Sequence, residues 1–355
     1  MSDGLAERGR GLARAGGRLL LADGALAIAA VVLMPILSVV WIALNPTENI
    51  WPHLVSTTLP RYLGNSVVLT LSVGLLAAAM GTGAAWLVTM YSFPGSRSLE
   101  WLLLMPLAVP GYIGAYVLVD LLQYAGPVQT ALRGLMGWTS ARDYWFPEVR
   151  SRGMASMVLA FALYPYVYML ARAAFREQSG GSYEVARALG AGPVGLFLRV
   201  GLPLARPAIA AGAAIVMMET VSVFGVVDFF GVQALTTGVF TTWLESANAG
   251  GAAQIALVIL GTVLALLYLE KVSRRQSRYY HSARQPRPIA RVRLSGAGAA
   301  LATALCTVPF ALGFVLPVAV MGAHAVAAPR EWLDPGLARA LIHTLAVAGS
   351  AALLT

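Results

Sequence analysis

Charged residues are scarce in this chain. Of its 355 residues, 12% are Asp, Glu, Lys or Arg and 58% are hydrophobic, whereas a soluble domain has about 25% charged residues. So little charge cannot cover the surface of a soluble core of this size. The composition therefore predicts a helical protein that crosses a membrane several times.

Lysine and cysteine each occur only once. Lys271 stands between Glu270 and Val272, so the Gly-Lys-Ser/Thr of a Walker A loop is missing and the chain does not bind ATP by that route. Cys306 has no second cysteine to pair with and lies in an apolar run, where a buried, unreactive thiol is expected. No nucleophile–base set stands out in the sequence, so we expect a protein that is not an enzyme.

Eight apolar segments approach or exceed the length of about 20 helical residues that crosses a hydrocarbon core about 30 Å thick. They are Ala25–Leu44, Asn65–Met90, Trp101–Leu122, Met154–Leu170, Ala208–Phe230, Ala252–Leu269, Leu294–Ala323 and the shorter Leu341–Thr355. In the second of them, Gly81-Thr82-Gly83 permits a bend or a close helix contact.

Basic residues predict the orientation of these spans. The net charge is +9, and the N-terminal tail 1–24 and the stretch 271–293 hold many of the arginines. Alternating spans place both on one side, which the positive-inside rule makes the cytoplasm. The segment 123–152 carries four arginines on the other side and breaks the rule, but inverting the chain would misplace the two larger basic segments. We attribute the basic excess to membrane orientation and not to nucleic acid.

A weak internal repeat predicts two successive modules. The segment "VLMPILSVV" around Pro35 is followed 30 residues later by the Asn-Ser of "LGNSVVLTLSVG", and "FVLPVAVMG" around Pro317 is followed 26 residues later by the His-Thr of "LIHTLAVAGS". We expect a first module of six spans at 25–270, a basic cytoplasmic linker at 271–293 and the start of a second module at 294–355. The second module stops early, so the chain is either a fragment or a truncated gene product, and we expect a fragment.

A polar stretch, residues 182–205, separates the fourth and fifth spans on the predicted cytoplasmic side. A helix is expected to begin after Ser182 and to end at Gly190. A second helix is expected to begin at Pro193 and to end at Leu202-Pro203. The pattern predicts a helix–turn–helix at the membrane surface, and an ordinary amphipathic surface loop is the alternative.

The spacing in this stretch resembles the EAA loop of bacterial ABC importer permeases, which reads Glu-Ala-Ala, three residues, Gly, nine residues, Ile-x-Leu-Pro. The matching positions are Glu184, Ala186, Gly190, Val200, Leu202 and Pro203. Val185 replaces the first alanine of the pattern, and valine replaces its isoleucine. The resemblance implies an all-α, polytopic membrane bundle of the MetI-like, type I permease kind, with two tandem six-span modules of which the second is truncated. It also implies that the EAA loop, within 175–205, docks on a separate ATPase subunit.

The flanking segments resemble the ferric-iron permeases, whose single chain holds two fused modules. The similarity rests on "YPYVYMLARAAF" before the loop and on "METVSVFGVVDFFGV" and "TTGVFTTW" after it. It implies a multi-pass protein of the bacterial inner membrane, with a cytoplasmic N-terminus, that passes ferric iron from a periplasmic binding protein to the cytoplasm. ATP is then bound by the partner ATPase, in two copies, and not by this chain. Permeases for thiamine, phosphonate or polyamine share the loop, and an ion-coupled secondary transporter is the alternative from another class.

Two acidic residues in the fifth predicted span, Glu219 and Asp228, are candidates for the translocation path. A charge at the bilayer midplane costs about 2.5–3.5 kcal/mol, so Glu219, expected near mid-span, should face the bundle interior or a water-filled path. We expect both carboxylates to help a cation pass, and the alternative is that they pair with polar groups and hold helices together. Asp120 is expected at a membrane boundary. The four histidines are scattered and assign no metal ligands.

Overall fold

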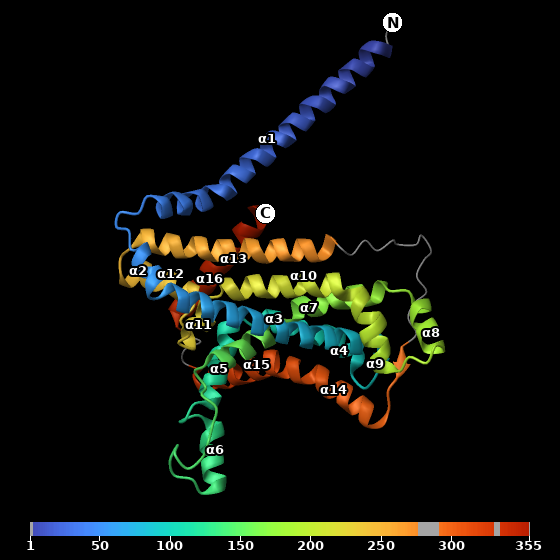
Figure 1. Ribbon diagram of the computed structural model, residues 1–355, viewed down its shortest axis with the longest axis vertical. Helices are drawn as coiled ribbons and strands as arrows, with labels where there is room; N and C mark the ends of the chain where they lie inside the picture. The colour runs from blue at the N-terminus through green and yellow to red at the C-terminus, as the bar shows by residue number, and fades with distance from the viewer. Residues whose placement is uncertain (1–2, 276–290, 330–333, 355) are drawn as a thin grey trace. The chain divides into compact units, whose positions relative to one another are not determined.

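The chain is helical in nearly all of its regular structure. The structure, a computed structural model, describes the backbone of residues 3–275, 291–329 and 334–354, and the side chains within residues 23–272, 291–329 and 334–353. Apart from a pair of two-residue strands, the described regular elements are helices or helical turns (Figure 1). The predicted all-α class is confirmed. The contacts divide the chain into two compact units, residues 1–67 with 233–266 and residues 68–232 with 267–355.

The first unit gathers the N-terminal helices and a distant pair of helices. Its elements are α1 (Asp3–Leu44), α2 (Trp51–Ser56), the start of α3 (Leu59–Met90), α12 (Leu235–Phe240), the π-helical turn η3 (Thr241–Glu245) and most of α13 (Ala249–Arg275). Leu54, Leu235 and Ile255 form its small buried core. Within this unit Ser66 Oγ accepts a hydrogen bond of 2.9 Å from the backbone N–H of Leu235, which fixes the start of α12 against α3.

The second unit holds the remaining elements. They are the rest of α3, β1 (Tyr91–Ser92), α4 (Ser96–Leu102), the 3-10 turn η1 (Met105–Ala108), α5 (Gly111–Leu122), α6 (Pro127–Met136), α7 (Arg152–Glu177), α8 (Gly180–Ala188), α9 (Pro193–Leu196), the π-helical turn η2 (Phe197–Gly201), α10 (Leu202–Ser222), α11 (Gly225–Phe229), β2 (Val292–Arg293), α14 (Gly296–Phe310), the π-helical turn η4 (Ala311–Val315), α15 (Leu316–Ala327) and α16 (Pro335–Leu354). β1 and β2 pair in parallel, with Tyr91 opposite Val292.

Helix α7 is the centre of the second unit, and glycines let its neighbours approach its backbone. A Cβ atom on Gly81 of α3 would lie 2.8 Å from Tyr164 O and from Tyr168 N of α7. A Cβ atom on Gly212 of α10 would lie 2.8 Å from Val167 Cα of the same helix. Of the two alternatives expected at Gly81-Thr82-Gly83, a bend or a close helix contact, the structure shows the close contact, and α3 runs through this point without a break.

In the part of the chain that the structure describes, seven helices are long and apolar enough to span a membrane. One further pair of helices reaches that length and apolarity only when its two bent parts are counted together. That pair corrects the prediction of a single third span over Trp101–Leu122. The chain bends by 90° between Ser96–Ala108 and Gly111–Met136. Pro110 causes the break, because proline favours an extended residue before it, and Val109 has φ −106° and ψ 116°.

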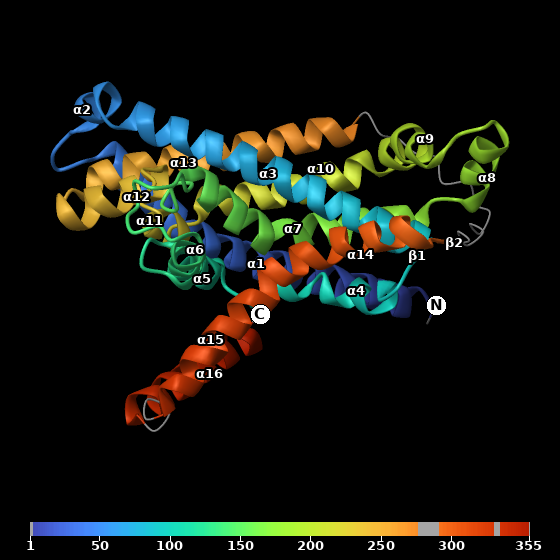
Figure 2. The ribbon, with the colours of Figure 1, turned by 90° about the horizontal axis from the view of Figure 1, so that it is seen from below.

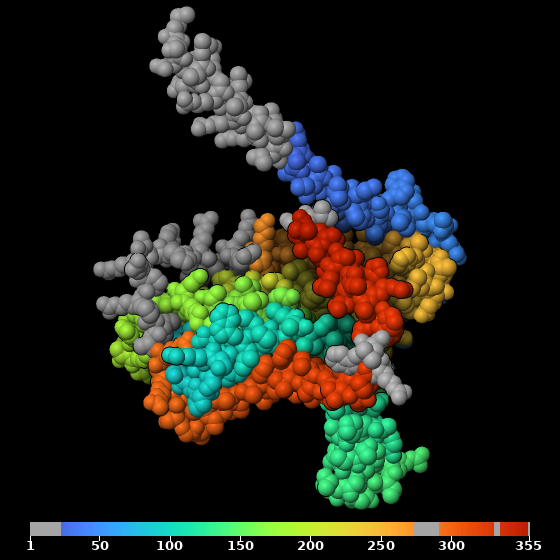
Figure 3. Space-filling model, turned by 180° about the vertical axis from the view of Figure 1, so that it is seen from behind, coloured from blue at the N-terminus to red at the C-terminus, as the bar shows by residue number. Residues whose placement is uncertain are grey.

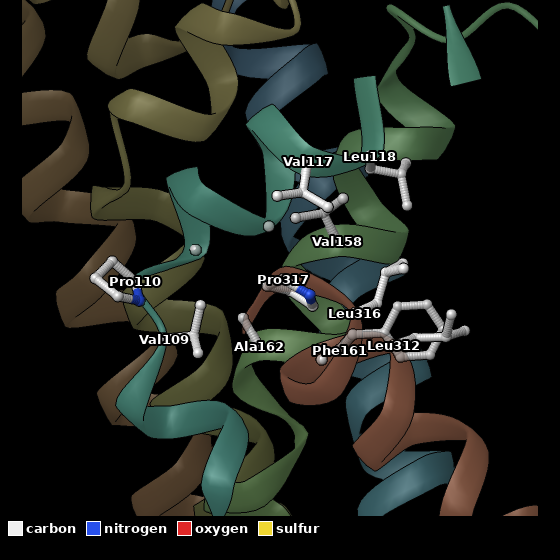
Figure 4. Close-up of a pocket in the computed structure, with 13 residues that line it drawn as sticks. Val109, Pro110, Val117, Leu118, Val158, Phe161, Ala162, Leu312, Leu316 and Pro317 are labelled. Carbon is white, nitrogen blue, oxygen red and sulfur yellow. The ribbon is translucent and has the colours of Figure 1, made fainter. Parts of the chain in front are cut away.

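The break lies beside a small apolar hollow of about 20 Å³ (Figure 4). Its walls come from Val109 and Pro110 at the break, from α5, from Phe161 and Ala162 of α7, and from the η4–α15 segment around Pro317. The lining residues carry no titratable side chain. We attribute this hollow to imperfect packing around the bend, since a ligand site needs a few convergent polar groups.

The fifth and seventh predicted spans also differ in extent from the structure. The fifth was expected over Ala208–Phe230, but α10 ends at Ser222 because Val223 takes an extended conformation, and α11 is a separate short helix. The seventh runs as Gly296–Ala327. Much of the predicted linker 271–293 lies outside the described residues, and the division into two modules stays a prediction.

Candidate functional site

The polar stretch between the fourth and fifth spans folds as two short helices joined at a glycine. Helix α8 begins at Gly180, after Ser179 and not after Ser182, so the prediction placed its start too late. Gly190 has φ +83°, a left-handed conformation that glycine adopts without strain. Its N–H donates to Arg187 O at 2.9 Å and ends the first helix. The second helix begins at Pro193, as predicted.

Leu202-Pro203 does not end the second helix, which corrects the sequence prediction. Leu196, Gly201 and Leu202 all keep right-handed helical backbone angles, and Pro193–Ser222 forms one helical stretch of 30 residues that is long enough to span the membrane. Pro203 lies in the first turn of α10. Proline has no backbone N–H to donate, and the preceding π-helical turn η2 accommodates this missing donor. The second arm of the turn is therefore continuous with a membrane-spanning helix.

A buried tryptophan anchors this segment, which we call the coupling segment (residues 180–205). The ring of Trp86, from the end of α3, lies 5.3 Å from that of Phe175, 5.9 Å from that of Tyr183 and 5.1 Å from that of Phe197, measured between ring centroids. A Cβ atom on Gly201 would lie 2.3 Å from the Trp86 ring. The four rings join α3, α7, α8 and η2, so the coupling segment is held as a rigid unit.

Hydrogen bonds add to this anchor. Tyr183 donates its hydroxyl proton to Gln178 Oε1, and Gln178 Nε2 donates to Gly201 O at 3.3 Å. Burial raises the pKa of Tyr183, so its hydroxyl stays protonated as a donor. The sequence analysis did not identify Trp86, Tyr183 and Gly201 as parts of this anchor. The sequence feature that could have indicated it is a set of aromatic residues at the ends of neighbouring polar and apolar segments.

The outer surface of the coupling segment is apolar with a charged edge. Its exposed apolar side chains are Val185, Leu189, Val194 and Leu198, with exposed fractions of 61%, 83%, 69% and 52%. Glu184, Arg187 and Arg199 are also exposed. Of the other predicted coupling residues, Gly190 is exposed, whereas Ala186, Val200, Leu202 and Pro203 are half-buried. An apolar patch with a polar rim is typical of a protein–protein contact.

A second projecting segment lies at the other end of α7. Residues 123–151 include α6 and a loop that folds against it: Arg133 donates to the Tyr144 hydroxyl at 3.1 Å, and the rings of Trp138 and Tyr144 stack at 4.8 Å. Helix α7 has 26 residues, about 39 Å at 1.5 Å per residue. That is enough to separate the two segments by the thickness of a membrane. Helices α6 and α8 lie toward opposite ends of α7 (Figure 1 and Figure 2).

The structure does not place Glu219 at mid-span. Glu219 lies in the last turn of α10 because that helix ends at Ser222, and its side chain is exposed, as is that of Asp228. Neither carboxylate faces the interior of this chain. Within the described residues neither accepts a hydrogen bond or forms an ion pair, which gives no support to the alternative that they hold helices together. Their role in a path stays a prediction.

The remaining candidates do not form a metal site among the residues that the structure describes. No group of three or more His, Cys, Asp or Glu side chains is placed to hold a metal ion in that part of the chain. Asp120 lies 3.6 Å from His324 Nε2, and Cys306 is buried as expected.

Similarity to known proteins covers more than half of the chain. The family model described as "Binding-protein-dependent transport system inner membrane component" matches residues 71–278. The Fe(3+)-transport system permease protein FbpB 2 of Haemophilus influenzae is 23% identical over 62% of this chain. The sulfate permease CysT of Salmonella typhimurium is 28% identical over 60% of this chain and 78% of its own length. The molybdenum permease ModB of Escherichia coli is 25% identical over 60% of this chain and 94% of its own.

Solved structures agree on the fold. A bacterial ABC transporter for the import of the acidic polysaccharide alginate has a chain that superposes with a TM-score of 0.58 at 18% identity, covering 73% of this chain and 96% of that one. The match to FbpB 2 covers 39% of that relative's length, whereas the match to ModB is nearly complete. The chain is thus a multi-pass membrane protein that belongs to the binding-protein-dependent transport system inner membrane component family, the permease subunits of ABC importers.

Proposed function

We propose that this chain passes ferric iron from a periplasmic binding protein into the cytoplasm, and that a separate ATPase, in two copies, drives it through the coupling segment. The observation that carries the coupling role is the continuity of α9, η2 and α10 over Pro193–Ser222. A partner that moves α9 also moves a membrane-spanning helix, whereas a flexible loop would absorb the displacement.

The surface chemistry of the coupling segment suits a protein partner. The apolar side chains of Val185, Leu189 and Val194 are available for burial in a cleft. Glu184 and Arg187 at the edge can pair with opposite charges and fix the orientation of the partner. Under this proposal the face that carries α8 is cytoplasmic, the N-terminal tail lies on the same side, and ATP is bound by the partner.

Family membership favours a binding-protein-dependent importer over an ion-coupled secondary transporter. Iron is supported by the resemblance of the segments around the coupling segment and by the relative FbpB 2. A second candidate is an oxyanion, because the sulfate and molybdenum permeases match this chain at 25–28% identity over most of their own length.

Uptake in cells tests the proposal directly. Cells that express this chain with its ATPase and binding protein are supplied in turn with radioactive ferric iron, sulfate and molybdate. We expect iron uptake that stops when ATP is depleted and continues when an uncoupler removes the ion gradient. Uptake of sulfate or molybdate in place of iron would favour the oxyanion candidate. Uptake that stops with the uncoupler alone would remove the importer mechanism.

Gly190→Val tests the turn of the coupling segment. A β-branched residue at φ +83° is strained by about 1–2 kcal/mol, which shifts α8 relative to α9. We expect co-purification of the ATPase and transport both to fall by about 10-fold. Gly190→Asn is the matched control, because asparagine tolerates this conformation and no atom lies within 4 Å of the new Cβ. Equal activity of the two variants would contradict the proposed role of the turn.

Glu219→Gln tests the translocation path. If the exposed carboxylate attracts a cation, removing its charge lowers iron uptake, and we expect a severalfold loss at unchanged expression. Met218→Gln on the preceding position controls for a polar amide at this level of α10. Unchanged uptake in the Glu219→Gln variant would remove this residue from the path.

A further inference from the structure

A cluster of arginines from distant parts of the chain surrounds one carboxylate in the second unit. Glu100 of α4 accepts hydrogen bonds from Arg172 and Arg176 of α7 and from Arg291, which precedes β2. The contact to Arg176 measures 2.8 Å. These residues are 72, 76 and 191 positions from Glu100 in sequence, so the fold assembles the cluster.

The cluster carries more positive than negative charge. Three guanidinium groups against one carboxylate leave a charge of +2. Arg172 is nearly buried with a side-chain exposure of 13%, whereas Arg176 and Arg291 are exposed by 49% and 31%. Because a guanidinium has five N–H donors, the two outer arginines keep donors available for a second anion beside Glu100.

The cluster also lies at the end of a membrane-spanning helix, where lipid headgroups are expected. Arg172 and Arg176 occupy the last two turns of α7, a membrane-spanning helix. Trp101, next to Glu100, is 66% exposed, and its ring centroid lies 5.9 Å from Arg172 Cζ. Exposed tryptophan beside arginine is typical of the membrane–water interface. Met105, the first residue of η1, is an apolar side chain that is 38% exposed. The segment around residue 100, teal in Figure 3, lies on the molecular surface.

We propose that Arg176 and Arg291 bind the phosphate of an anionic phospholipid, whose acyl chain lies along Trp101 and Met105. Basic pockets between membrane helices bind such headgroups, and arginine is suited to bidentate contacts with phosphate. The site needs only that the chain spans a membrane, which its family shows. Because the end of α7 leads into α8, the lipid would lie in the cytoplasmic leaflet, and this part of the proposal rests on the proposed function.

Lipid titration of the purified transporter complex tests the site. Native mass spectrometry measures the binding of phosphatidylglycerol and of phosphatidylcholine to the complex in detergent. We expect phosphatidylglycerol to bind about 10-fold more tightly, and Arg176→Gln and Arg291→Gln each to weaken it severalfold without changing phosphatidylcholine binding. Arg142→Gln removes an exposed arginine from the segment at the other end of α7 and should leave both affinities unchanged.

Two further measurements distinguish a loss of lipid binding from a loss of folding and from the binding of free phosphate. The melting temperature of each variant in phosphatidylcholine alone reports folding, and it should match that of the wild type. Inorganic phosphate should not displace bound phosphatidylglycerol from the complex. If it does, the site recognises free phosphate and the lipid assignment is overturned. Equal binding of the two lipids, or no effect of either variant, also overturns the proposal. If no sample transports, including the wild type, that result contradicts the proposed function only. The lipid site is then still tested by the measured affinities for phosphatidylglycerol and phosphatidylcholine.

Discussion

Replacing Gly201 by valine should lower transport by about 10-fold to 100-fold while the membrane helices remain folded. A Cβ atom at this position would lie 2.3 Å from the Trp86 ring, well inside contact distance. Trp86 cannot turn away at low cost, because the rings of Phe175, Tyr183 and Phe197 surround it at 5.1–5.9 Å. The clash therefore displaces η2 or expels the tryptophan, and either change detaches the coupling segment from α3.

The expected size of this effect follows from the strain. Inserting methyl groups into a packed site costs about 1–3 kcal/mol, and strain of this size in the coupled state lowers transport by about 10-fold to 100-fold. ATP-driven uptake in proteoliposomes measures it, with co-purification of the ATPase as a second readout. Unfolding is monitored by gel filtration of the purified complex.

A second substitution distinguishes the Trp86 contact from a general intolerance of Gly201. Trp86→Leu removes the ring that meets the new side chain but leaves a smaller apolar side chain among Phe175, Tyr183 and Phe197. The double variant Trp86→Leu, Gly201→Val should therefore recover part of the lost transport. Such recovery is non-additive, as expected for residues in direct contact. A Gly201→Val variant that transports at the wild-type rate would show that the anchor does not control coupling.

Rules that relate a residue to its neighbours in sequence were sufficient to predict those features that depend only on these neighbours. Gly190 and Pro193 mark the end and the start of adjacent helices because a left-handed glycine and a proline in the first turn act within a few residues. Long apolar segments likewise predict spans from their own composition. The helical class and the turn of the coupling segment were therefore accessible from the sequence alone.

Other features depend on parts of the chain that no local pattern connects. The bend at Pro110 was missed because average hydropathy does not register a change of direction between two apolar helices. The expected mid-span position of Glu219 was wrong because the sequence placed the end of this span at Phe230, whereas α10 ends at Ser222. Trp86 and Glu100 gain their partners only from the tertiary fold, since Arg291 is 191 residues from Glu100.

The packing of α3 against α7 leads to the prediction with the largest effect on stability. Gly81→Val should greatly reduce the amount of folded protein, because its Cβ atom would lie 2.8 Å from Tyr164 O and from Tyr168 N. Both are backbone atoms of a helix, so no side-chain rotation relieves the clash and the two helices must separate. Overpacking costs about 1–3 kcal/mol where side chains can adjust, and a loss of at least the upper value, about 3 kcal/mol, is expected here.

Gly83 provides the matched control on the same helix. It lies two residues further along α3, and a Cβ atom added to it meets nothing within 4 Å. Gly83→Val therefore carries the same change in helix propensity without the clash. Fluorescence-detected gel filtration over a temperature series should give a near wild-type melting temperature for Gly83→Val and little folded protein for Gly81→Val. If the two variants have the same melting temperature, the loss of stability comes from valine within a helix and not from the contact between α3 and α7. The central position of α7 in the second unit would then have to be reconsidered.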